Sequence, residues 1–270
     1  MRAPSPHPLS RDGREGGWSG RGGAAYGTPG FPRSPEGLRA RLLSCIIGGD
    51  ERTRRADRRA FVNAPLPAPL PSNPFPLVER WLNEAAAAVR SPTAMTLATV
   101  DPDGRPSARM VICRGVDAEA GWLVFYTDRE SRKGSALAAH PRAALVFYWE
   151  ALERQIRVEG PVTAAPDGDS NAYWRTRPLD ARIAAIASDQ TRPIASRDAL
   201  LAKVDAATER FGADPPRPER WGGYRVWADT IELWVGQPAR VHDRAVWTRA
   251  LAPAPGGFTG SAWRSTRLQP

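Results

Sequence analysis

The sequence is poor in the residues that build disulfide frameworks and metal sites. Its 270 residues include 2 cysteines, Cys45 and Cys113, and 3 histidines, His7, His140 and His242. Two cysteines give no disulfide framework and no metal-ligand cluster, and no pair of the histidines has the spacing that puts ligands on one helix face. We therefore expect neither a disulfide-stabilised secreted domain nor a zinc site.

Long apolar runs and phosphate-binding glycine loops are also missing. No stretch of about 18 apolar residues occurs, so we expect no membrane-spanning helix. The N-terminus has no apolar segment of the signal-peptide type, and the short run at residues 42–47 lies too far from Met1. A cytoplasmic protein is the expectation. Since neither a G-x-G-x-x-G loop nor a Walker loop is present, no Rossmann or P-loop cofactor site is indicated.

Basic charge is concentrated near the start of the sequence. The net charge is +9, and residues 1–70 alone hold 12 arginines against 6 acidic residues. The rest of the chain is close to neutral, so binding to nucleic acid is not favoured. Only 2 of the 38 basic residues are lysines, which makes a lysine inside a motif more noticeable.

Composition divides the chain into a tail and one domain. Residues 1–72 are rich in Arg, Pro, Gly and Ser with little hydrophobic periodicity, which is typical of a disordered tail. Asn73 is a good N-cap and Pro74 suits the first helical position. Apolar residues then recur at helical spacing from Phe75 to Val89. The domain is predicted to span residues 73–270.

The order of the expected elements indicates an antiparallel barrel with helices packed outside it. Residues 167–212 are expected to be helical with a break around Pro193, and residues 251–261 to be a loop before a short terminal strand. The other expected elements are strands over 95–100, 108–114 and 122–127, a helix over 132–139, and strands over 143–149, 155–162, 223–235 and 240–248.

The most informative motif is Glu130-Ser131-Arg132-Lys133-Gly134. Ser131 is a good N-cap, so Arg132 and Lys133 fall in the first turn of a helix. Two cations are unfavourable there, because a helix N-terminus already carries partial positive charge. An anion between them would resolve this, with backbone N–H groups and both side chains converging on a phosphate. The alternative is two solvated cations on a short surface helix.

Three further groups are candidates for anion binding. Arg109 lies on an apolar strand and needs a partner, either a phosphate or a structural carboxylate. Tyr173 and Arg177 are four apart on an expected helix and would clamp a phosphate, although packing produces the same spacing. Arg240 and His242 are two apart on an expected strand and would share one face. The alternative for this last pair is an exposed strand with ordinary charges.

Blocks of the sequence resemble the pyridoxamine/pyridoxine 5′-phosphate oxidase family. The resemblance covers about residues 73–270, with every block in the family's order. It includes the opening helix over residues 73–82 and the first hairpin over residues 92–109. The later blocks are Phe125-Tyr126-Thr127, Ser131-Arg132-Lys133-Gly134, residues 145–149 and 154–160, Arg177-Pro178, Ser188-Asp189-Gln190, Trp221-Gly222-Gly223-Tyr224, Arg240-Val241-His242-Asp243-Arg244 and residues 267–270.

The resemblance implies a mainly β fold with peripheral helices, an antiparallel, Greek-key-like FMN-binding split β-barrel. It implies a homodimer with one FMN at each side of the subunit interface. Arg109, Arg132 and Lys133 would hold the FMN phosphate. Residues implied to contact the rest of the flavin, some from the partner chain, are Tyr126, Thr127, Gln155, Gln190, Trp234 and Arg244.

The resemblance also implies a reaction and a substrate site. A hydride would pass from C4′ of a phosphorylated B6 vitamer to flavin N5, and O₂ would reoxidise the flavin with release of H₂O₂. The product would be pyridoxal 5′-phosphate, the protein supplying position and electrostatics. Arg114, Tyr173 and Arg177 would hold the substrate phosphate. Arg240 and His242, the catalytic candidates, would hold the pyridine ring and its phenolic oxygen.

Two positions depart from the family's pattern. Arg114 stands where the family usually has lysine, which keeps the charge but changes reach and fork geometry. Ala181 stands where a hydroxyl residue is expected. Two alternatives therefore remain beside vitamin B6 phosphate oxidation: a paralogue that oxidises another ring, of the phenazine-biosynthesis type, and a non-catalytic flavin- or B6-binding protein. Tyr173, Arg177, Arg240 and His242 favour the B6 interpretation.

Overall fold

The computed structural model describes residues 64–270, so residues 1–63 of the tail expected over residues 1–72 lie outside this range. The packed chain begins upstream of the predicted domain start at Asn73. Leu66 is buried, and its backbone N–H donates to Asp243 Oδ2 at 2.7 Å. Pro71 carbonyl oxygen accepts a hydrogen bond from Trp247 Nε1 at 2.8 Å. Residues 64–72 thus run along the C-terminal strands as part of the domain.

An antiparallel sheet of ten strands dominates the described part of the chain, and its path runs in the order β12-β9-β8-β6-β5-β1-β2, with β3, β4 and β7 joined at the side. Two further strands, β10 (Leu251–Ala254) and β11 (Gly257–Gly260), form a separate hairpin. The strands of the large sheet are β1 (Ala94–Val100), β2 (Pro106–Ile112), β3 (Gly115–Asp117), β4 (Trp122–Asp128), β5 (Arg142–Trp149), β6 (Arg154–Ala164), β7 (Trp221–Trp227), β8 (Thr230–Val235), β9 (Asp243–Thr248) and β12 (Arg264–Leu268).

Strand β6 curls the sheet because it changes partner along its length. Residues 154–159 pair with β8, whereas residues 162–164 pair with β7. Gly160 lies between these two pairings, where an added Cβ would lie 1.8 Å from the carbonyl oxygen of Trp227. Any larger residue would push the chain apart at this point. The resulting half-barrel confirms the split-barrel prediction and brings β4 and β7 beside the long sheet.

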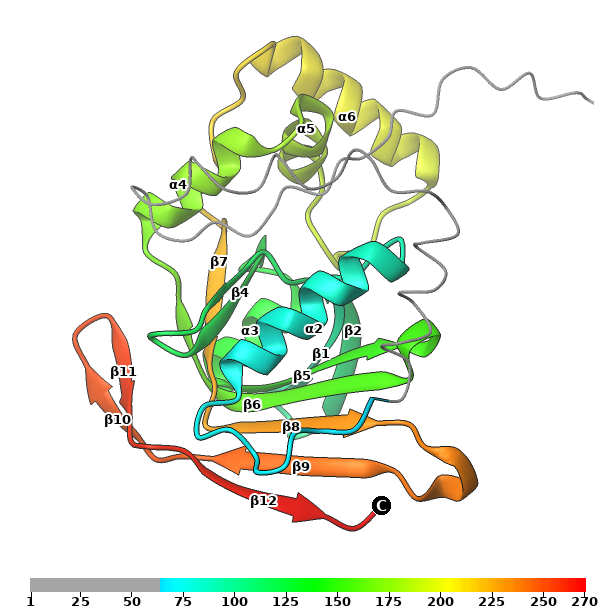
Figure 1. Ribbon diagram of the computed structural model, residues 1–270. Helices are drawn as coiled ribbons and strands as arrows, with labels where there is room; N and C mark the ends of the chain where they lie inside the picture. Colours follow the sequence, from blue (N-terminus) through cyan, green and yellow to red (C-terminus); the bar gives the residue numbers. More distant parts are fainter. Residues whose placement is uncertain (1–63) are drawn as a thin grey trace, which may run out of the picture. The chain divides into compact units, whose positions relative to one another are not determined.

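The helices lie outside the strands, as expected. They are α2 (Phe75–Ala88), α3 (Arg132–Ala139), α4 (Asp167–Thr176), α5 (Leu179–Ala187) and α6 (Arg197–Phe211), with short 3₁₀ turns at Glu150–Leu152 and Pro238–Arg240. In Figure 1, α4, α5 and α6 gather at one end, and β9 and β12 lie at the opposite edge. No helix of the described residues is long and apolar enough to cross a membrane.

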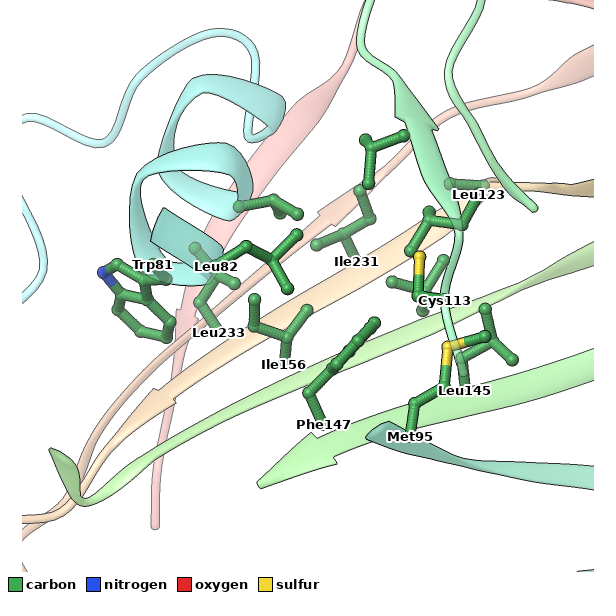
Figure 2. Packing of buried hydrophobic residues seen from close by; sticks show 14 of the residues in the cluster. Trp81, Leu82, Met95, Cys113, Leu123, Leu145, Phe147, Ile156, Ile231 and Leu233 are labelled. Carbon is green, nitrogen blue, oxygen red and sulfur yellow. The ribbon is translucent and has the colours of Figure 1, made fainter. Parts of the chain in front are cut away.

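The core forms between α2 and one face of the sheet. Leu82 of α2 points toward Leu233 and Ile156 on the strands (Figure 2), Trp81 lies beside it, and all four are buried. Because side chains alternate along a strand, the residues between these buried ones face the other way. This outer face carries large exposed side chains, including Tyr148, which is 57% exposed, and Met110, which is 62% exposed.

Three expected elements differ from the structure. The single strand predicted over 223–235 is two strands, β7 and β8, separated at Ala228 and Asp229. The strand predicted from Arg240 begins at Asp243 instead, because Ala239 and Arg240 adopt φ values of 56° and 62°, which end an extended chain. The loop predicted over 251–261 contains the β10–β11 hairpin.

Candidate active site

The turn between β4 and α3 is held by Asp128. Its Oδ1 accepts a hydrogen bond from the backbone N–H of Glu130 at 2.7 Å, and its carbonyl oxygen accepts one from the Ser131 hydroxyl at 2.6 Å. Glycine is needed in the first turn of α3, because a Cβ on Gly134 would lie 1.9 Å from the carbonyl oxygen of Arg129. The predicted helix start is therefore confirmed, tight against the end of β4.

Lys133 lies with two other predicted cofactor residues, Thr127 and Gln190. Its Nζ donates to the Ser131 hydroxyl at 3.0 Å and, in a shorter contact, to Gln190 Oε1. Thr127 Oγ1 donates to the same Gln190 oxygen at 3.0 Å. Burial, reinforced by repulsion from Arg109 and opposed by Asp128, lowers the pKa of Lys133 to about 8. Thr127, Lys133 and Gln190 thus meet although they come from β4, α3 and the loop after α5.

Arg109 of β2 belongs to the same neighbourhood, since its charge acts on Lys133. Its Nη1 donates to Thr99 Oγ1 at 2.7 Å and to the carbonyl oxygens of Leu97 and Ser107, both at 3.1 Å. Burial lowers the pKa of Arg109, and Asp101 partly opposes this shift. The hydrogen-bond partners of this arginine are therefore uncharged oxygens, and its charge remains available to an anion.

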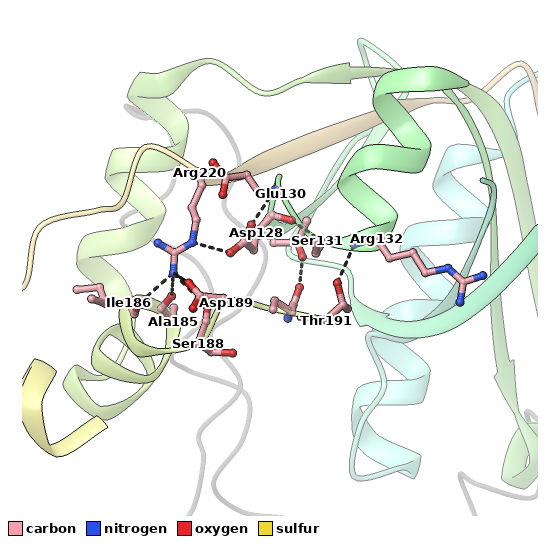
Figure 3. A network of polar contacts seen from close by, with 12 residues as sticks. Asp128, Glu130, Ser131, Arg132, Ala185, Ile186, Ser188, Asp189, Thr191 and Arg220 are labelled. Carbon is pink, nitrogen blue, oxygen red and sulfur yellow. Dashed lines mark hydrogen bonds and ion pairs between the residues drawn. The ribbon is translucent and has the colours of Figure 1, made fainter. Parts of the chain in front are cut away.

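Arg132 points away from Lys133. Its Nε and Nη2 donate to Asp101 Oδ2 at 3.0 and 2.5 Å, and its side chain is 62% exposed. Figure 3 shows it extending away from Ser131. The two cations thus diverge, in contrast to the predicted convergence on one phosphate. Sequence reasoning missed Asp101, whose pKa is lowered chiefly by the hydrogen bond from Arg132.

The backbone at the start of α3 has a partner from a distant loop. The N–H of Arg132 donates to Thr191 Oγ1 at 2.9 Å, so a threonine hydroxyl takes the capping position that was expected of Ser131. An open cavity of about 510 Å³ lies on this side of α3. Its lining residues are Asp101, Pro102, Asp103, Arg105, Glu130, Arg132, Ser135, Thr191 and Arg192.

A second group is built on aromatic stacking. Tyr126 stacks on Tyr173 with ring centroids 4.2 Å apart, and on Trp221 at 5.5 Å. Burial raises the pKa of Tyr126 to about 12 and raises that of Tyr173 as well. Sequence reasoning assigned Trp221 no role, although it opens the conspicuous Trp221-Gly222-Gly223-Tyr224 motif. Tyr126 therefore faces the predicted substrate residues rather than the Lys133 group.

Two arginines flank this aromatic stack. Arg114 lies 5.7 Å from the centroid of the Tyr173 ring, and Arg177 lies 4.7 Å from that of Trp221. Arg177 Nη2 also donates to the carbonyl oxygen of Ala181 at 2.8 Å. Burial lowers the pKa of Arg177, while Tyr173 opposes this and Arg114 adds to it. The structure thus brings together Arg114, Tyr173 and Arg177, the three residues expected at the substrate phosphate.

The third group lies on the outer face of the sheet. Gln155, Trp234 and Arg244 are register partners in one row across β6, β8 and β9. Arg244 Nε and Nη2 donate to Glu232 Oε1 at 3.0 and 2.8 Å. This row belongs to the part of the sheet opposite helices α4, α5 and α6 (Figure 1).

Arg240 and His242 do not share a strand face, which corrects the sequence prediction. Arg240 is exposed in a 3₁₀ turn with φ of 62°, and His242 precedes β9. His242 Nδ1 accepts a hydrogen bond from the backbone N–H of Gln237 at 3.1 Å, and its ring centroid is 4.7 Å from that of Trp234. The turn, rather than strand alternation, determines where these two side chains lie.

Comparison with known proteins gives matches along most of the described residues. The family model described as pyridoxamine 5′-phosphate oxidase matches residues 82–211, and that of the pyridoxine 5′-phosphate oxidase C-terminal dimerisation region matches residues 221–270. A pyridoxine/pyridoxamine 5′-phosphate oxidase of Burkholderia multivorans is 54% identical over 199 residues, which are 73% of this chain and 89% of the relative. A pyridoxine/pyridoxamine 5′-phosphate oxidase of Burkholderia orbicola is 51% identical over 199 residues, again 73% of this chain and 89% of the relative.

Solved structures give the same fold. PhzG from Burkholderia lata, in complex with tetrahydrophenazine-1-carboxylic acid, is 31% identical with a TM-score of 0.70, over 78% of this chain and all of its own. A pyridoxamine 5′-phosphate oxidase-related, FMN-binding protein from Nostoc punctiforme is 20% identical with a TM-score of 0.58, over 73% of this chain and 97% of its own. The second likeness concerns the fold alone.

Proposed function

Given that this chain belongs to the pyridoxamine 5′-phosphate oxidase family of FMN-dependent oxidoreductases, we propose that it oxidises pyridoxamine 5′-phosphate and pyridoxine 5′-phosphate to pyridoxal 5′-phosphate. O₂ is the electron acceptor and is reduced to H₂O₂; with the amine substrate, water is also consumed and ammonia is released. The observation that carries this proposal is the buried Lys133 at the start of α3, whose hydrogen-bond partners are the uncharged oxygens of Ser131 and Gln190. A buried ammonium beside a second cation calls for an anion.

The residues around Lys133 fit a flavin phosphate. Lys133 and Arg109 supply two positive charges, and the first turn of α3 supplies the partial positive charge of a helix N-terminus. Binding of a phosphate would raise the pKa of Lys133 again and would let Arg132 contribute from the exposed side. Thr127 and Gln190 would position the flavin beyond its phosphate. When bound, FMN supplies the redox chemistry by accepting a hydride and passing electrons to O₂.

The aromatic group fits the phosphate of the substrate. Arg114 lies over the Tyr173 ring and Arg177 over the Trp221 ring, so two positive charges flank the aromatic stack. Burial destabilises the charged form of Arg177, which an anion would offset. Arg177 uses one N–H for the Ala181 carbonyl oxygen, and the other guanidinium donors would bind phosphate oxygens. Arg114 replaces the point charge of a lysine by a fork that can bind two oxygens.

His242 and Arg240 would act on the pyridine ring. Because His242 Nδ1 accepts a backbone hydrogen bond, its Nε2 is the nitrogen that carries the proton and can donate to the phenolic oxygen. Arg240 is exposed in the adjoining turn and would add a positive charge beside the same oxygen. Both residues would hold and polarise the ring while the reacting carbon faces the flavin.

We further propose that a second copy of the chain covers the outer face of the sheet. The matched dimerisation region includes β7, β8, β9 and β12. Tyr148 and Met110 are more than half exposed on this face, which is costly for large apolar side chains unless a partner covers them. Gln155, Trp234 and Arg244 lie on the same face, so in a dimer they would reach the flavin held by the other subunit.

An oxidase assay tests the proposed function. FMN-loaded protein is supplied with pyridoxamine 5′-phosphate or with unphosphorylated pyridoxamine, and H₂O₂ release is followed. We expect turnover with the phosphate ester and kcat/KM lower by about a hundredfold or more without it, the loss of several charge-assisted hydrogen bonds. Equal kcat/KM for the two amines would contradict the proposal.

A second candidate function is oxidation of a different anionic ring. It is favoured by the 31% identity to PhzG and by Ala181, which has no side-chain hydroxyl to donate to a substrate phosphate. A third is non-catalytic binding. Anaerobic flavin spectra separate these cases. Bleaching by pyridoxamine 5′-phosphate supports the first function, bleaching only by tetrahydrophenazine-1-carboxylic acid supports the second, and bleaching by neither supports binding alone.

A further inference from the structure

Arg220 connects two parts of the candidate site that are far apart in the sequence. It lies directly before β7, and its side chain is 20% exposed. Its Nε donates to Asp128 Oδ2 at 2.7 Å. Its backbone carbonyl oxygen also accepts the N–H of Arg129 at 2.6 Å. Arg220 is thus bound to the same Asp128 that holds the β4–α3 turn.

The other end of the guanidinium closes the C-terminus of α5. Nη2 of Arg220 donates to the carbonyl oxygens of Ala185 at 3.3 Å, Ile186 at 2.9 Å and Ser188 at 3.1 Å. The last carbonyl groups of a helix have no partner within the helix and carry partial negative charge. A cation placed across them therefore determines where α5 ends and how the chain leaves it (Figure 3).

The segment that leaves α5 carries the contacts to α3. Two residues after Ser188, Gln190 accepts hydrogen bonds from Lys133 and Thr127. Thr191 follows with φ of 71°, a strained conformation for a β-branched residue, and its hydroxyl accepts the N–H of Arg132. Such strain persists only where the surrounding contacts hold the backbone in place.

A second ion pair supports this segment from outside. Lys203 of α6 donates to Asp189 Oδ2 at 2.6 Å, and this hydrogen bond is the main reason that the pKa of Asp189 is lowered. Both partners are about half exposed, so the pair contributes little by itself. Arg220 and its partner Asp128 are much less exposed, and their contacts therefore dominate the position of the segment.

We propose that Arg220 is a positioning residue for the cofactor site: by bridging Asp128 and the C-terminus of α5, it holds Gln190 and Thr191 against the start of α3. The inference rests on the proposed binding of a flavin phosphate at Lys133. Arg220 touches none of Lys133, Thr127 and Arg132 in the contacts described above. It acts on them through the segment over residues 188–191 and through Asp128, which holds the β4–α3 turn. A lysine would keep the charge beside Asp128 but could not span both partners.

A double-mutant cycle tests this assignment. FMN affinity is measured by flavin fluorescence in wild-type protein, Arg220→Gln, Arg220→Lys, Gln190→Ala and the double variant Arg220→Gln/Gln190→Ala. We expect Arg220→Gln to weaken FMN binding about tenfold, or ~1.4 kcal/mol. Arg220→Lys keeps a cation beside Asp128 and should preserve the fold, so its loss of FMN affinity should be somewhat smaller. In the Gln190→Ala background the effect of Arg220→Gln should shrink to about twofold or less, because a shared pathway makes the two losses non-additive.

Hydrogen exchange provides a readout that does not depend on flavin. In the cofactor-free protein, the peptide covering residues 185–191 should exchange faster in Arg220→Gln and Arg220→Lys than in the wild type. Arg142→Gln, which breaks the exposed Arg142–Asp229 ion pair elsewhere on the sheet, is the matched control and should leave both exchange and FMN affinity unchanged.

The two measurements separate the inference from the proposed function. If the wild type does not bind FMN, the proposed function fails, while faster exchange at 185–191 would still support the bridge. If the wild type binds FMN, equal losses from Arg220→Gln in both backgrounds would overturn the positioning role. Unchanged exchange at 185–191, or exchange that rises throughout the domain, would overturn it as well.

Discussion

The β4–α3 turn and the outer face of β6, β8 and β9 carry different parts of the candidate site, and they differ in what completes them. At the turn, Thr127, Lys133 and Gln190 are hydrogen-bonded to one another within one chain. On the outer face, Gln155, Trp234 and Arg244 form a row, and Arg244 is held by Glu232 of the same face. The first group is assembled by folding, whereas we propose that the second acts only against another subunit.

Because of this difference, binding of the cofactor phosphate should depend on one chain, whereas the contacts to the rest of the flavin should depend on dimerisation. A region that is complete in one chain is expected to bind its anion whether or not the protein dimerises. A region on an exposed sheet face contributes only when a second copy covers it. Variants placed in one region or the other should therefore affect cofactor binding and assembly separately.

The largest effect is expected from a charge on the outer face. Tyr148→Glu should weaken the dimer by several hundredfold or more, since a buried unpaired carboxylate costs about 3–5 kcal/mol. The isolated chain should fold normally, because Tyr148 is 57% exposed within it. Sedimentation equilibrium measures the outcome. Leu201→Glu, at a 46% exposed position on α6, is the matched control and should remain dimeric. A Tyr148→Glu protein that stays dimeric would remove this face from the interface.

The next largest effect concerns the two neighbouring cations at the start of α3. Lys133→Met should weaken FMN binding about a hundredfold, and Arg132→Met about tenfold, the range expected for charge-assisted hydrogen bonds. The order follows from the structure: Lys133 is buried, whereas Arg132 is 62% exposed and paired with Asp101. Titration of each cofactor-free variant with FMN measures both losses. A larger loss from Arg132→Met than from Lys133→Met would contradict the assignment of Lys133 as the main ligand of the phosphate.

A smaller effect is expected from pH. The pKa of Lys133 in the cofactor-free protein is about 8, so its charge is complete below this pH and is lost above it. The dissociation constant of FMN should be level between about pH 7 and pH 8, where the flavin phosphate is a dianion, and rise by up to about tenfold per pH unit above pH 8. Lys133→Met should lack this dependence, and the same slope in both proteins would assign the titration to another group.

The lowered pKa of Lys133 affects folding stability in the opposite direction: higher pH weakens FMN binding but favours the folded state. The folded pKa of Lys133, about 8, lies below its ordinary value of 10.5, so the unfolded chain binds more protons between these two values. The contribution of Lys133 to the free energy of unfolding of the cofactor-free protein should therefore rise with pH across that window. Thermal unfolding of wild type against Lys133→Met isolates this contribution.

Local patterns predicted much of the fold. The first helix and α3 appear at the expected residues, and most strands lie within a few residues of their expected bounds. The pattern failed over residues 223–235, which were expected to form one strand, because the backbone N–H groups of Ala228 and Asp229 bond to Gly121 and Glu159 and separate β7 from β8. The left-handed φ of Arg240 could not be predicted, because the residue is not a glycine and no sequence pattern marks the turn.

The site was less predictable than the fold because its contacts join distant residues. Arg132 turns to Asp101, which lies 31 positions earlier. Arg220 reaches Asp128 across 92 positions. No periodicity or short motif encodes such pairs, since they exist only after the sheet has curled. The resemblance to a family named Gln190 and Lys133 as site residues, but it did not indicate that Thr191 caps α3.

The most direct test of the central claim compares FMN with riboflavin, which has the same ring system without the phosphate. Cofactor-free wild-type protein should bind riboflavin about a hundredfold or more weakly than FMN, because Lys133, Arg109 and the start of α3 then have no anion to bind. Lys133→Met should reduce the ratio of the affinities for FMN and riboflavin. Equal affinities for FMN and riboflavin in the wild type would contradict a phosphate site at the start of α3.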